Sequence, residues 1–261
     1  PDSVCMDSFN ATASSAVNSV IARSWSIASK RAVTSSSLSI CHSRGAEIAK
    51  ELGGDSFFAE ADVSSEDQVT EALDAAVGTF GSIQVVVNCA GIGSAGRTVG
   101  KGNTPFNLDI FRKTLEVNLV GTFNVIRLAA ARMADNSPNE DGERGAIINT
   151  ASVAAFEGQI GQCAYSASKG GIVGMTLPIA RDLSAVGVRV NTIAPGLIDT
   201  PIYGEGEQSE AFKTHLGQSV LFPRRLGSGE ELAFMVMDLL TNPYMNGEVV
   251  RVDGGIRMPP K

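Results

Sequence analysis

The chain has 261 residues, 43% of them hydrophobic and 19% charged, so it can bury one large core, and α/β folds of this length are commonly single domains. Its net charge of -7 and sequence pI near 4.9 disfavour a nucleic-acid partner, because phosphate backbones are bound by clustered Lys and Arg, and they favour small-molecule ligands. No run of 18 apolar residues occurs, so we expect no membrane partner.

The cysteines and histidines predict no structural metal, because they show no C-x-x-C pattern and no metal-ligand spacing. We therefore expect a reducing compartment: the bacterial cytoplasm, with the mitochondrial matrix as the alternative. The residues concerned are Cys5, Cys41, Cys89, Cys163, His42 and His215.

The first 44 residues differ in kind from the rest of the chain. They contain no glycine, thirteen of the first 43 are Ser, and no Asp or Glu occurs between Asp7 and Glu47. A Ser-rich, basic, acid-free N-terminus is typical of an organellar transit peptide. The stretch that begins at Gly45, however, already has the apolar stripe of the helix that follows the second strand of a Rossmann half. We therefore predict that residues 1–44 replace the first βαβ unit rather than extend a complete domain.

From residue 45 onward, short apolar runs alternate with stretches of helical period, which is the pattern of βα units around a parallel sheet. The sequence predicts an α/β fold, a single Rossmann-like doubly wound parallel sheet with helices on both faces, in which residues 45–261 belong to one domain and the first βαβ unit is aberrant. The predicted strands are 57–63, 83–88, 146–150, 188–193 and 248–252, and the predicted helices are 65–77 (capped by Ser64 or Ser65), 108–133, 164–183 and 230–240.

The region from Ile202 to Phe222 is less regular in its pattern. A segment between a strand end and a helix is suited to cover a substrate, and an ordinary surface loop is the alternative interpretation.

Tyr165 and Lys169 give the first chemical signal. They are four residues apart in a predicted helix, so their side chains emerge on one face about one turn apart. A tyrosine that acts as a base near neutral pH needs a stabilised phenolate, and a neighbouring ammonium lowers the pKa of the phenol. Alone, the Tyr-x-x-x-Lys pattern is weak, because a surface pair on a helix is the default explanation.

Ser152 strengthens this signal. It stands just past the carboxyl end of the predicted strand 146–150, where ligands bind in open parallel sheets. Its hydroxyl would donate a hydrogen bond to a carbonyl oxygen that develops negative charge, and a turn cap is the alternative. The run Asn88-Cys89-Ala90-Gly91 also ends a predicted strand. Asn118 lies inside a predicted helix, where Asn is mildly unfavourable and structural hydrogen bonding is a sufficient reason.

With these motifs in this order, the chain resembles the short-chain dehydrogenase/reductase family over residues 45–261. Runs from Gly145 to Leu183 and from Asn246 to Met258 are similar to those of its short-chain 3-hydroxyacyl-CoA dehydrogenases of the type-2 class. The resemblance implies an oxidoreductase that transfers a hydride between NAD and a secondary alcohol or ketone, either a short-chain 3-hydroxyacyl-CoA or a steroid-like alcohol. It also implies a homotetramer.

The resemblance assigns catalytic and substrate-binding roles. Tyr165 would remove the hydroxyl proton during oxidation, Lys169 would hold the nicotinamide ribose and lower the pKa of the phenol, and Ser152 would fix the substrate oxygen. Asn118 would hold a water in the proton relay, and Gln159 would contact the substrate.

The resemblance also assigns NAD contacts. Asp62 and Val63 would meet the adenine, the backbone of Cys89–Gly91 would pass beneath the adenosine ribose, and Ile198 with Thr200 would engage the carboxamide. The full set is Asp62, Val63, Asn88, Cys89, Ala90, Gly91, Tyr165, Lys169, Pro195, Gly196, Ile198 and Thr200.

The N-terminal segment departs from the family, which places a Thr-Gly-x-x-x-Gly-x-Gly loop after its first strand and an acidic residue at the end of its second. Neither is present, and the acidic position falls near Ile40 or Cys41. One hypothesis is that residues 11–43 were read in a shifted frame, and true divergence is the other. Without amides that converge on a pyrophosphate, cofactor affinity would fall by many powers of ten.

A second functional hypothesis follows from this departure. The chain would be a noncatalytic oligomeric scaffold that keeps the fold and has lost dinucleotide binding. The glycine-free N-terminus favours the scaffold, whereas the retained Ser152, Tyr165 and Lys169 favour the enzyme.

Overall fold

A computed structural model of the chain describes residues 31–35, 40–52, 56–200, 203 and 206–260. Most of the glycine-free segment lies outside the described residues. This includes the positions at which the family has its glycine-rich dinucleotide loop, whose glycines this sequence lacks. The described elements, in chain order, are β1 (Arg31–Ser35), α2 (Ile40–Leu52), β2 (Ser56–Glu60), α3 (Glu66–Phe80), β3 (Val85–Asn88), α4 (Leu108–Leu115), α5 (Gly121–Met133), β4 (Gly145–Thr150), α6 (Cys163–Ser184), β5 (Val188–Pro195), α7 (Glu207–Gly217), α8 (Gly229–Thr241) and β6 (Val249–Val252).

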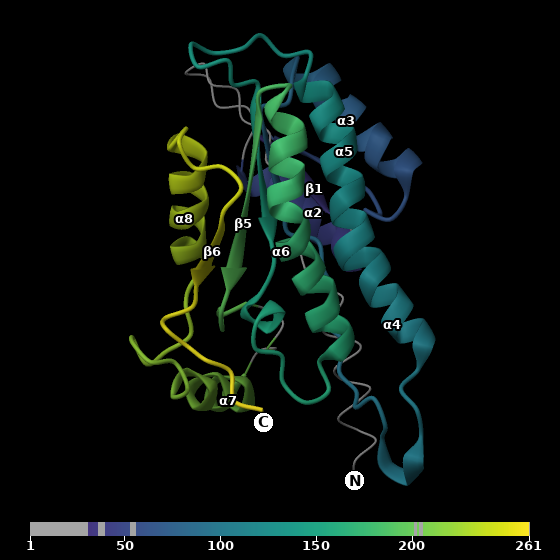
Figure 1. Ribbon diagram of the computed structural model, residues 1–261, viewed down its shortest axis with the longest axis vertical. Helices are drawn as coiled ribbons and strands as arrows, with labels where there is room; N and C mark the ends of the chain where they lie inside the picture. Colours follow the sequence, from purple (N-terminus) through teal and green to yellow (C-terminus); the bar gives the residue numbers. More distant parts are fainter. Residues whose placement is uncertain (1–30, 36–39, 53–55, 201–202, 204–205, 261) are drawn as a thin grey trace.

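All pairings between the described strands are parallel, as the alternation of strands and helices predicts (Figure 1). The strands form two groups, β1–β2 and β3–β4–β5–β6. Because the strands of each group run in the same direction, their carboxyl ends lie at the same edge of that group. The loops that carry the predicted site residues leave from that edge.

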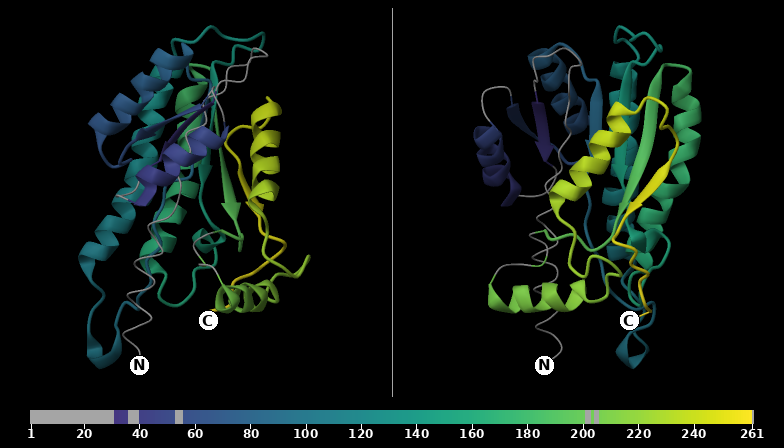
Figure 2. Two further views of the ribbon diagram at one scale, coloured as in Figure 1. Left: turned by 180° about the vertical axis from the view of Figure 1, so that it is seen from behind. Right: turned by 90° about the vertical axis from the view of Figure 1, so that its left-hand side faces the viewer.

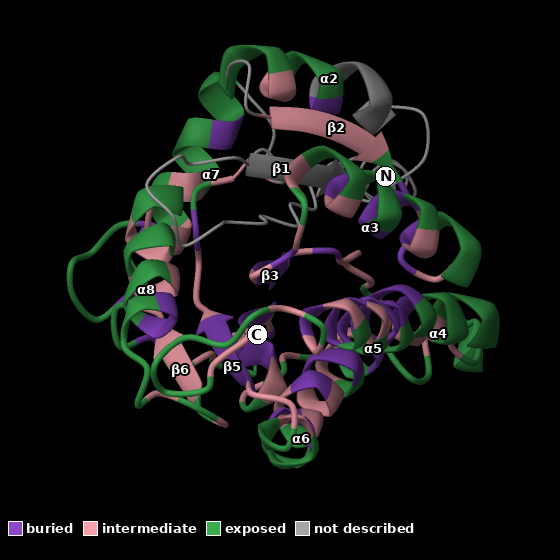
Figure 3. Cartoon of the chain, turned by 90° about the horizontal axis from the view of Figure 1, so that it is seen from above, coloured by how far each residue is buried: buried purple, intermediate pink, exposed green. Residues whose placement is uncertain are grey.

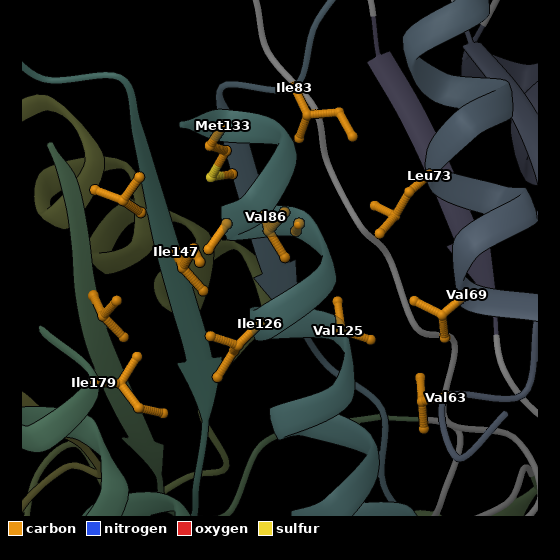
Figure 4. Close-up of a cluster of buried hydrophobic side chains, with 14 of the residues drawn as sticks. Val63, Val69, Leu73, Ile83, Val86, Val125, Ile126, Met133, Ile147 and Ile179 are labelled. Carbon is orange, nitrogen blue, oxygen red and sulfur yellow. The ribbon is translucent and has the colours of Figure 1, made fainter. Parts of the chain in front are cut away.

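The central strands are covered on both faces, which confirms the doubly wound arrangement (Figure 2). Val86 of β3 and Ile147 of β4 pack with residues of α3, α5 and α6 in the largest apolar cluster (Figure 4). Val85 and Val87, which point to the opposite face, pack with Leu239 of α8. A strand buried on both faces reads as a continuous apolar run, and this is why β3 and β4 were recognisable in the sequence.

The β1–β2 pair is less completely covered than the centre of the sheet. Four of the five residues of β2 are only half-buried, whereas all four of β3 are buried (Figure 3). The helix α2 packs closely on β2 at Gly45, where an added Cβ would lie 2.3 Å from the ring of Phe58. This close approach explains the glycine that opens the recognisable part of the sequence.

The predicted helix 108–133 is interrupted. A π-helical turn, Glu116–Val120, separates α4 from α5 and contains Asn118. Such single turns insert one residue into a helix and are frequent at functional sites. The interruption supplies a reason for an asparagine at this position.

Two further boundaries differ from the sequence-based expectation. The strand β2 ends at Glu60, so Asp62 and Val63 lie in the turn before α3, whose N-cap is Ser65. The region Ile202–Phe222 contains a regular helix, α7, and its description as irregular was wrong. The buried residues of α7, Ser209 and Gly217, are small or polar, so the helix has little apolar periodicity to detect. Among the described helices, none combines the length and apolar character needed to cross a membrane.

A buried ion pair fastens the amino-terminal end of β5 to its surroundings. Arg189 and Glu143 form a bidentate pair with N–O distances of 3.0 and 3.1 Å, and their side chains are only 8% and 6% exposed. The same guanidinium donates to the carbonyls of Leu239 and Leu240, at the end of α8, and to that of Met245. Arg189 thus satisfies carbonyls that the end of a helix leaves without partners.

We predict that Glu143→Gln lowers the free energy of unfolding by about 3 to 5 kcal/mol, because it leaves a buried guanidinium without its counter-charge. Asp74→Asn is the matched control, because Asp74 pairs with Arg132 at 2.6 Å but is 62% exposed. The control should lose less than about 1 kcal/mol. Urea denaturation followed by circular dichroism measures both, and equal small losses would contradict the prediction.

Candidate active site

The predicted catalytic residues belong to the carboxyl edge of the central strands, where the parallel strands β4 and β5 end. Ser152 lies two residues past the end of β4, and α6 supplies both Tyr165 and Lys169. The helix α6 packs along β5 and against the short turn Val153–Ala155 that follows β4, so its first two turns lie beside this edge. The topology therefore brings the three side chains into one region.

The side chain of Ser152 lies close enough to Tyr165 to lower the pKa of its phenol. Ser152 also caps the short 3₁₀ turn Val153–Ala155, because its Oγ accepts from the backbone N–H of Ala154 at 3.1 Å. Ser152 therefore has the capping role that was the alternative interpretation of the sequence. The cap ties the side chain of Ser152 to the turn that follows β4.

Lys169 is buried and held by the backbone of β4. Its Nζ donates to the carbonyl of Thr150 at 2.9 Å and lies 5.8 Å from the centroid of the Tyr165 ring. Burial lowers the pKa of Lys169 to about 8, and Cys89 opposes this effect. No described carboxylate pairs with this ammonium, and an ammonium has three hydrogens, so donor capacity remains for a ligand.

The side chain of Asn118 fastens the loop that follows β3. Its Oδ1 accepts from the N–H of Ile92 at 2.7 Å, and its Nδ2 donates to the carbonyl of Ile92 and to Oγ of Ser168, both at 3.0 Å. Both hydrogens of the amide are therefore used, and Oδ1 keeps one lone pair. The hydrogen bonds of Asn118 are therefore structural, as one interpretation of the sequence held.

The Asn88–Gly91 run passes along the same edge. Asn88 donates to Oδ1 of Asn149 at 2.9 Å, across the β3–β4 pair. Cys89 accepts a weak hydrogen bond from Oγ1 of Thr150 at 3.7 Å. A Cβ on Gly91 would lie 3.3 Å from Oδ1 of Asn118 and 3.4 Å from Nζ of Lys169. The backbone therefore runs directly beside the lysine, and a side chain at this glycine would crowd the site.

Asp62 and Val63 form the turn between β2 and α3. The carboxylate of Asp62 accepts from the N–H and the hydroxyl of Ser64 at 2.9 and 2.6 Å. Burial raises the pKa of Asp62, but these bonds and the charge of Lys113 outweigh it, so the net pKa lies below its ordinary value. Asp62 therefore remains ionised near neutral pH and can accept hydrogen bonds from a ligand.

The residues Pro195 to Thr200 leave β5 toward α7. Gly196 donates to the carbonyl of Val252, and a Cβ there would lie 2.8 Å from Asp253, so the chain is tightly packed at this exit. Ile198 is buried and forms an isolated parallel bridge with Gly227. The segment is thus fixed by backbone contacts before it reaches Thr200.

Gln159 is the predicted site residue whose observed contacts lead elsewhere. Its Nε2 donates to the carbonyl of Pro259 at 3.1 Å, and its N–H donates to Oε1 of Gln162. The neighbouring Ile160 donates to the carbonyl of Pro260. The structure therefore joins Gln159 to the C-terminal segment, and its predicted contact with substrate stays a prediction.

The expected lowering of the Tyr165 pKa is not produced by the protein groups. Burial raises the pKa of Tyr165 above its ordinary value, and the side chain of Ser152 only partly opposes this. Lys169 lies 5.8 Å from the centroid of the ring, and its charge is not among the causes that shift the pKa of Tyr165. Tyr165 nevertheless keeps some exposed surface.

Three residues at the site were not singled out from the sequence. The carbonyl of Thr150 binds Lys169, Oγ of Ser168 binds Asn118, and the phenol of Tyr203 interacts electrostatically with that of Tyr165. Ser168 follows Tyr165 by three residues on one helix, so helical spacing was a usable signal. A backbone carbonyl leaves no signal in a sequence, and Tyr203 stood in the region taken as irregular.

The described residues fit the nicotinamide end of a dinucleotide. Lys169 has hydrogens left to donate and no carboxylate partner among the described residues, so hydroxyl groups of a ribose suit it. The glycine backbone at Gly91 leaves room for a ligand beside this lysine. Within the described part of the chain, no three His, Cys, Asp or Glu side chains gather as a metal site would require.

Comparisons with known proteins agree with this arrangement. A family model described as enoyl-(acyl carrier protein) reductase matches residues 16–257. The chain is 55% identical to 3-hydroxyacyl-CoA dehydrogenase type-2 of Homo sapiens over 85% of both chains, and 36% identical to ipsdienol dehydrogenase of Ips pini over 75% of this chain and 78% of that one. The crystal structure of 3-hydroxyacyl-CoA dehydrogenase type-2 from Mycobacterium avium superposes with a TM-score of 0.81 at 43% identity, covering 88% of this chain and 87% of that one.

These relatives are oxidoreductases by name, and they cover most of this chain and most of their own length. The scaffold hypothesis receives no support from them. Together with the shared edge of the sheet at which Ser152, Tyr165 and Lys169 meet, they show that the chain is an oxidoreductase that belongs to the short-chain dehydrogenase/reductase family.

Proposed function

We propose that the protein is an NAD-dependent dehydrogenase of short-chain 3-hydroxyacyl-CoA thioesters. The observation that carries the proposal is the convergence of Ser152, Tyr165 and Lys169 at one sheet edge, in a chain that is 55% identical to a protein named 3-hydroxyacyl-CoA dehydrogenase type-2. Steroid-like secondary alcohols are a second substrate class for the same chemistry.

In the proposed reaction Ser152 holds the substrate oxygen and Tyr165 exchanges a proton with it. When the ketone is reduced, the O–H bond of Tyr165 breaks and its proton moves to the oxygen that develops negative charge. Burial keeps Tyr165 protonated at neutral pH, so the protein groups favour the acid role of the phenol. The hydroxyl of Ser152 stabilises the same oxygen by a hydrogen bond.

A bound nicotinamide dinucleotide supplies or accepts the hydride, and its oxidised ring carries a positive charge. Lys169 would hold the ribose with its free hydrogens while the carbonyl of Thr150 fixes its position. Asp62 and Val63 would meet the adenine, the backbone of the Asn88–Gly91 run would pass the adenosine ribose, and the segment from Pro195 to Thr200 would meet the carboxamide. Asn118 would bind a relay water through the free lone pair of its Oδ1.

We further propose a homotetramer that works in a reducing compartment, with the cytoplasm preferred over the mitochondrial matrix. Large apolar side chains remain exposed on α5 and α6, among them Phe123 and Leu177, as a face covered by another subunit would require. Cys163 is an exposed thiol, which a reducing compartment would keep from oxidation. Size-exclusion chromatography with light scattering tests the oligomeric state.

Tyr165→Phe should lower the turnover of acetoacetyl-CoA with NADH by about a hundredfold to ten-thousandfold, because the ring stays while the hydroxyl that carries the exchangeable proton is lost. The loss of NADH absorbance measures the rate. Tyr244→Phe is the matched control, because Tyr244 is 97% exposed and should leave the rate unchanged. Circular dichroism should show the same fold in both variants, and comparable turnover by Tyr165→Phe would remove the phenol from the mechanism.

The pH dependence of stability should reveal the buried lysine. Because burial lowers the pKa of Lys169 from 10.5 to about 8, the folded protein binds fewer protons than the unfolded chain between these values. The free energy of unfolding should therefore rise across this range relative to that of Lys169→Met. Urea denaturation near pH 7 and about pH 9.5 measures the difference. Lys101→Met, which removes an ammonium from an exposed position, is the matched control. A difference for Lys169→Met that does not change with pH would contradict the assignment.

A further inference from the structure

Tyr203 is a second phenol at the site that the proposed reaction does not use. Its N–H donates to the carbonyl of Thr200, the last residue of the predicted carboxamide-binding segment, at 3.2 Å. Among the described residues, its hydroxyl has no hydrogen-bond partner. The chain thus presents a hydrogen-bond donor near the substrate region with no protein acceptor for it among those residues.

The helix α7 holds Tyr203 in place from behind. The Tyr203 ring packs on that of Phe212 with centroids 6.2 Å apart, and its carbonyl accepts from Oγ of the buried Ser209 at 2.8 Å. Lys213, also on α7, bridges to Asp199 at 2.9 Å in the segment that precedes Tyr203. Figure 1 shows α7 lying below the carboxyl ends of β5 and β6, so it supports this segment at the site.

Tyr203 follows the carboxyl end of β5, and Ser152 follows the carboxyl end of the neighbouring β4, so both belong to the same edge of the sheet. Burial raises the pKa of Tyr203 to about 12, and the phenol of Tyr165 and the charge of Asp199 add to the effect. Tyr203 is therefore protonated throughout the neutral range and acts there as a hydrogen-bond donor. The phenol of Tyr165 contributes to this shift, which agrees with the placement of Tyr165 and Tyr203 at one edge of the sheet.

A 3-hydroxyacyl thioester carries two oxygens on its acyl chain, at C3 and at the thioester carbonyl. The proposed function assigns the C3 oxygen to Ser152 and Tyr165, which leaves the carbonyl in need of a donor. We propose that the hydroxyl of Tyr203 donates a hydrogen bond to the thioester carbonyl of the substrate, and thereby favours acyl thioesters over simple secondary alcohols. This assignment rests on the proposed function.

Two analogues that differ only at the carbonyl test it: butanoyl-CoA, a thioester, and S-butyl-CoA, the thioether with CH₂ in place of the carbonyl. Isothermal titration calorimetry on the full chain measures the Kd of each. The unmodified protein should bind butanoyl-CoA more tightly. Tyr203→Phe keeps the ring that packs on Phe212 and should weaken butanoyl-CoA about tenfold, while S-butyl-CoA changes by less than about twofold.

Tyr244→Phe is the control, because it removes an exposed phenol that lies beside the turns preceding β5. It should change neither Kd. Equal weakening of both analogues by Tyr203→Phe would show a structural role and overturn the assignment while leaving the proposed function standing. If neither analogue binds the unmodified protein, the acyl-CoA substrate is wrong and the role of Tyr203 fails with it.

Discussion

The geometry of the site depends on the bond from Nζ of Lys169 to the carbonyl of Thr150. This bond ties the second turn of α6 to the end of β4, the strand from which Ser152 follows. It fixes the distance between the serine and the helix that carries the phenol, because both partners sit on rigid elements. A loop could not hold two hydroxyls in register so closely, since its backbone has more freedom.

The same bond compensates in part for burying an ammonium. A charged group that is taken from water without a counter-charge loses several kcal/mol, and its pKa falls until the loss is limited. The bond to Thr150 is made by a neutral carbonyl, so the pKa of Lys169 still falls to about 8. The ammonium of Lys169 therefore keeps hydrogens that are free to donate to a hydroxyl group of a ligand. Part of the stability of the fold is given up for this.

The central fold could be predicted well from the sequence, because strands buried on both faces consist of continuous apolar runs. The apolar runs of β3 and β4 and the cap at Ser65 could be read directly. The site could be predicted where its residues share one helix, as Tyr165 and Lys169 do. The π-helical turn at Asn118 could not be predicted, because it depends on bonds to Ile92 and Ser168, which lie 26 and 50 residues away.

The helix α7 shows a different limit. Helix prediction depends on apolar periodicity, and α7 buries a serine and a glycine while Phe212 stays half exposed. Its role is to carry contacts to the segment beside it, through Ser209 and Lys213, rather than to fill the core. An element that supports a site in this way leaves a polar pattern, which a search for core helices passes over.

Burial shifts the pKa values of the two phenols and of the lysine in opposite directions. Burial raises the pKa of Tyr165 and Tyr203 and lowers that of Lys169, so all three shifts favour neutral groups. A neutral phenol suits proton donation to a ketone, which is the reductive direction. Oxidation needs a phenolate, and a positive charge brought into the same region is what would stabilise one. The protein groups therefore prepare reduction by themselves, and the balance between the two directions depends on the charge of the nicotinamide ring that occupies the site.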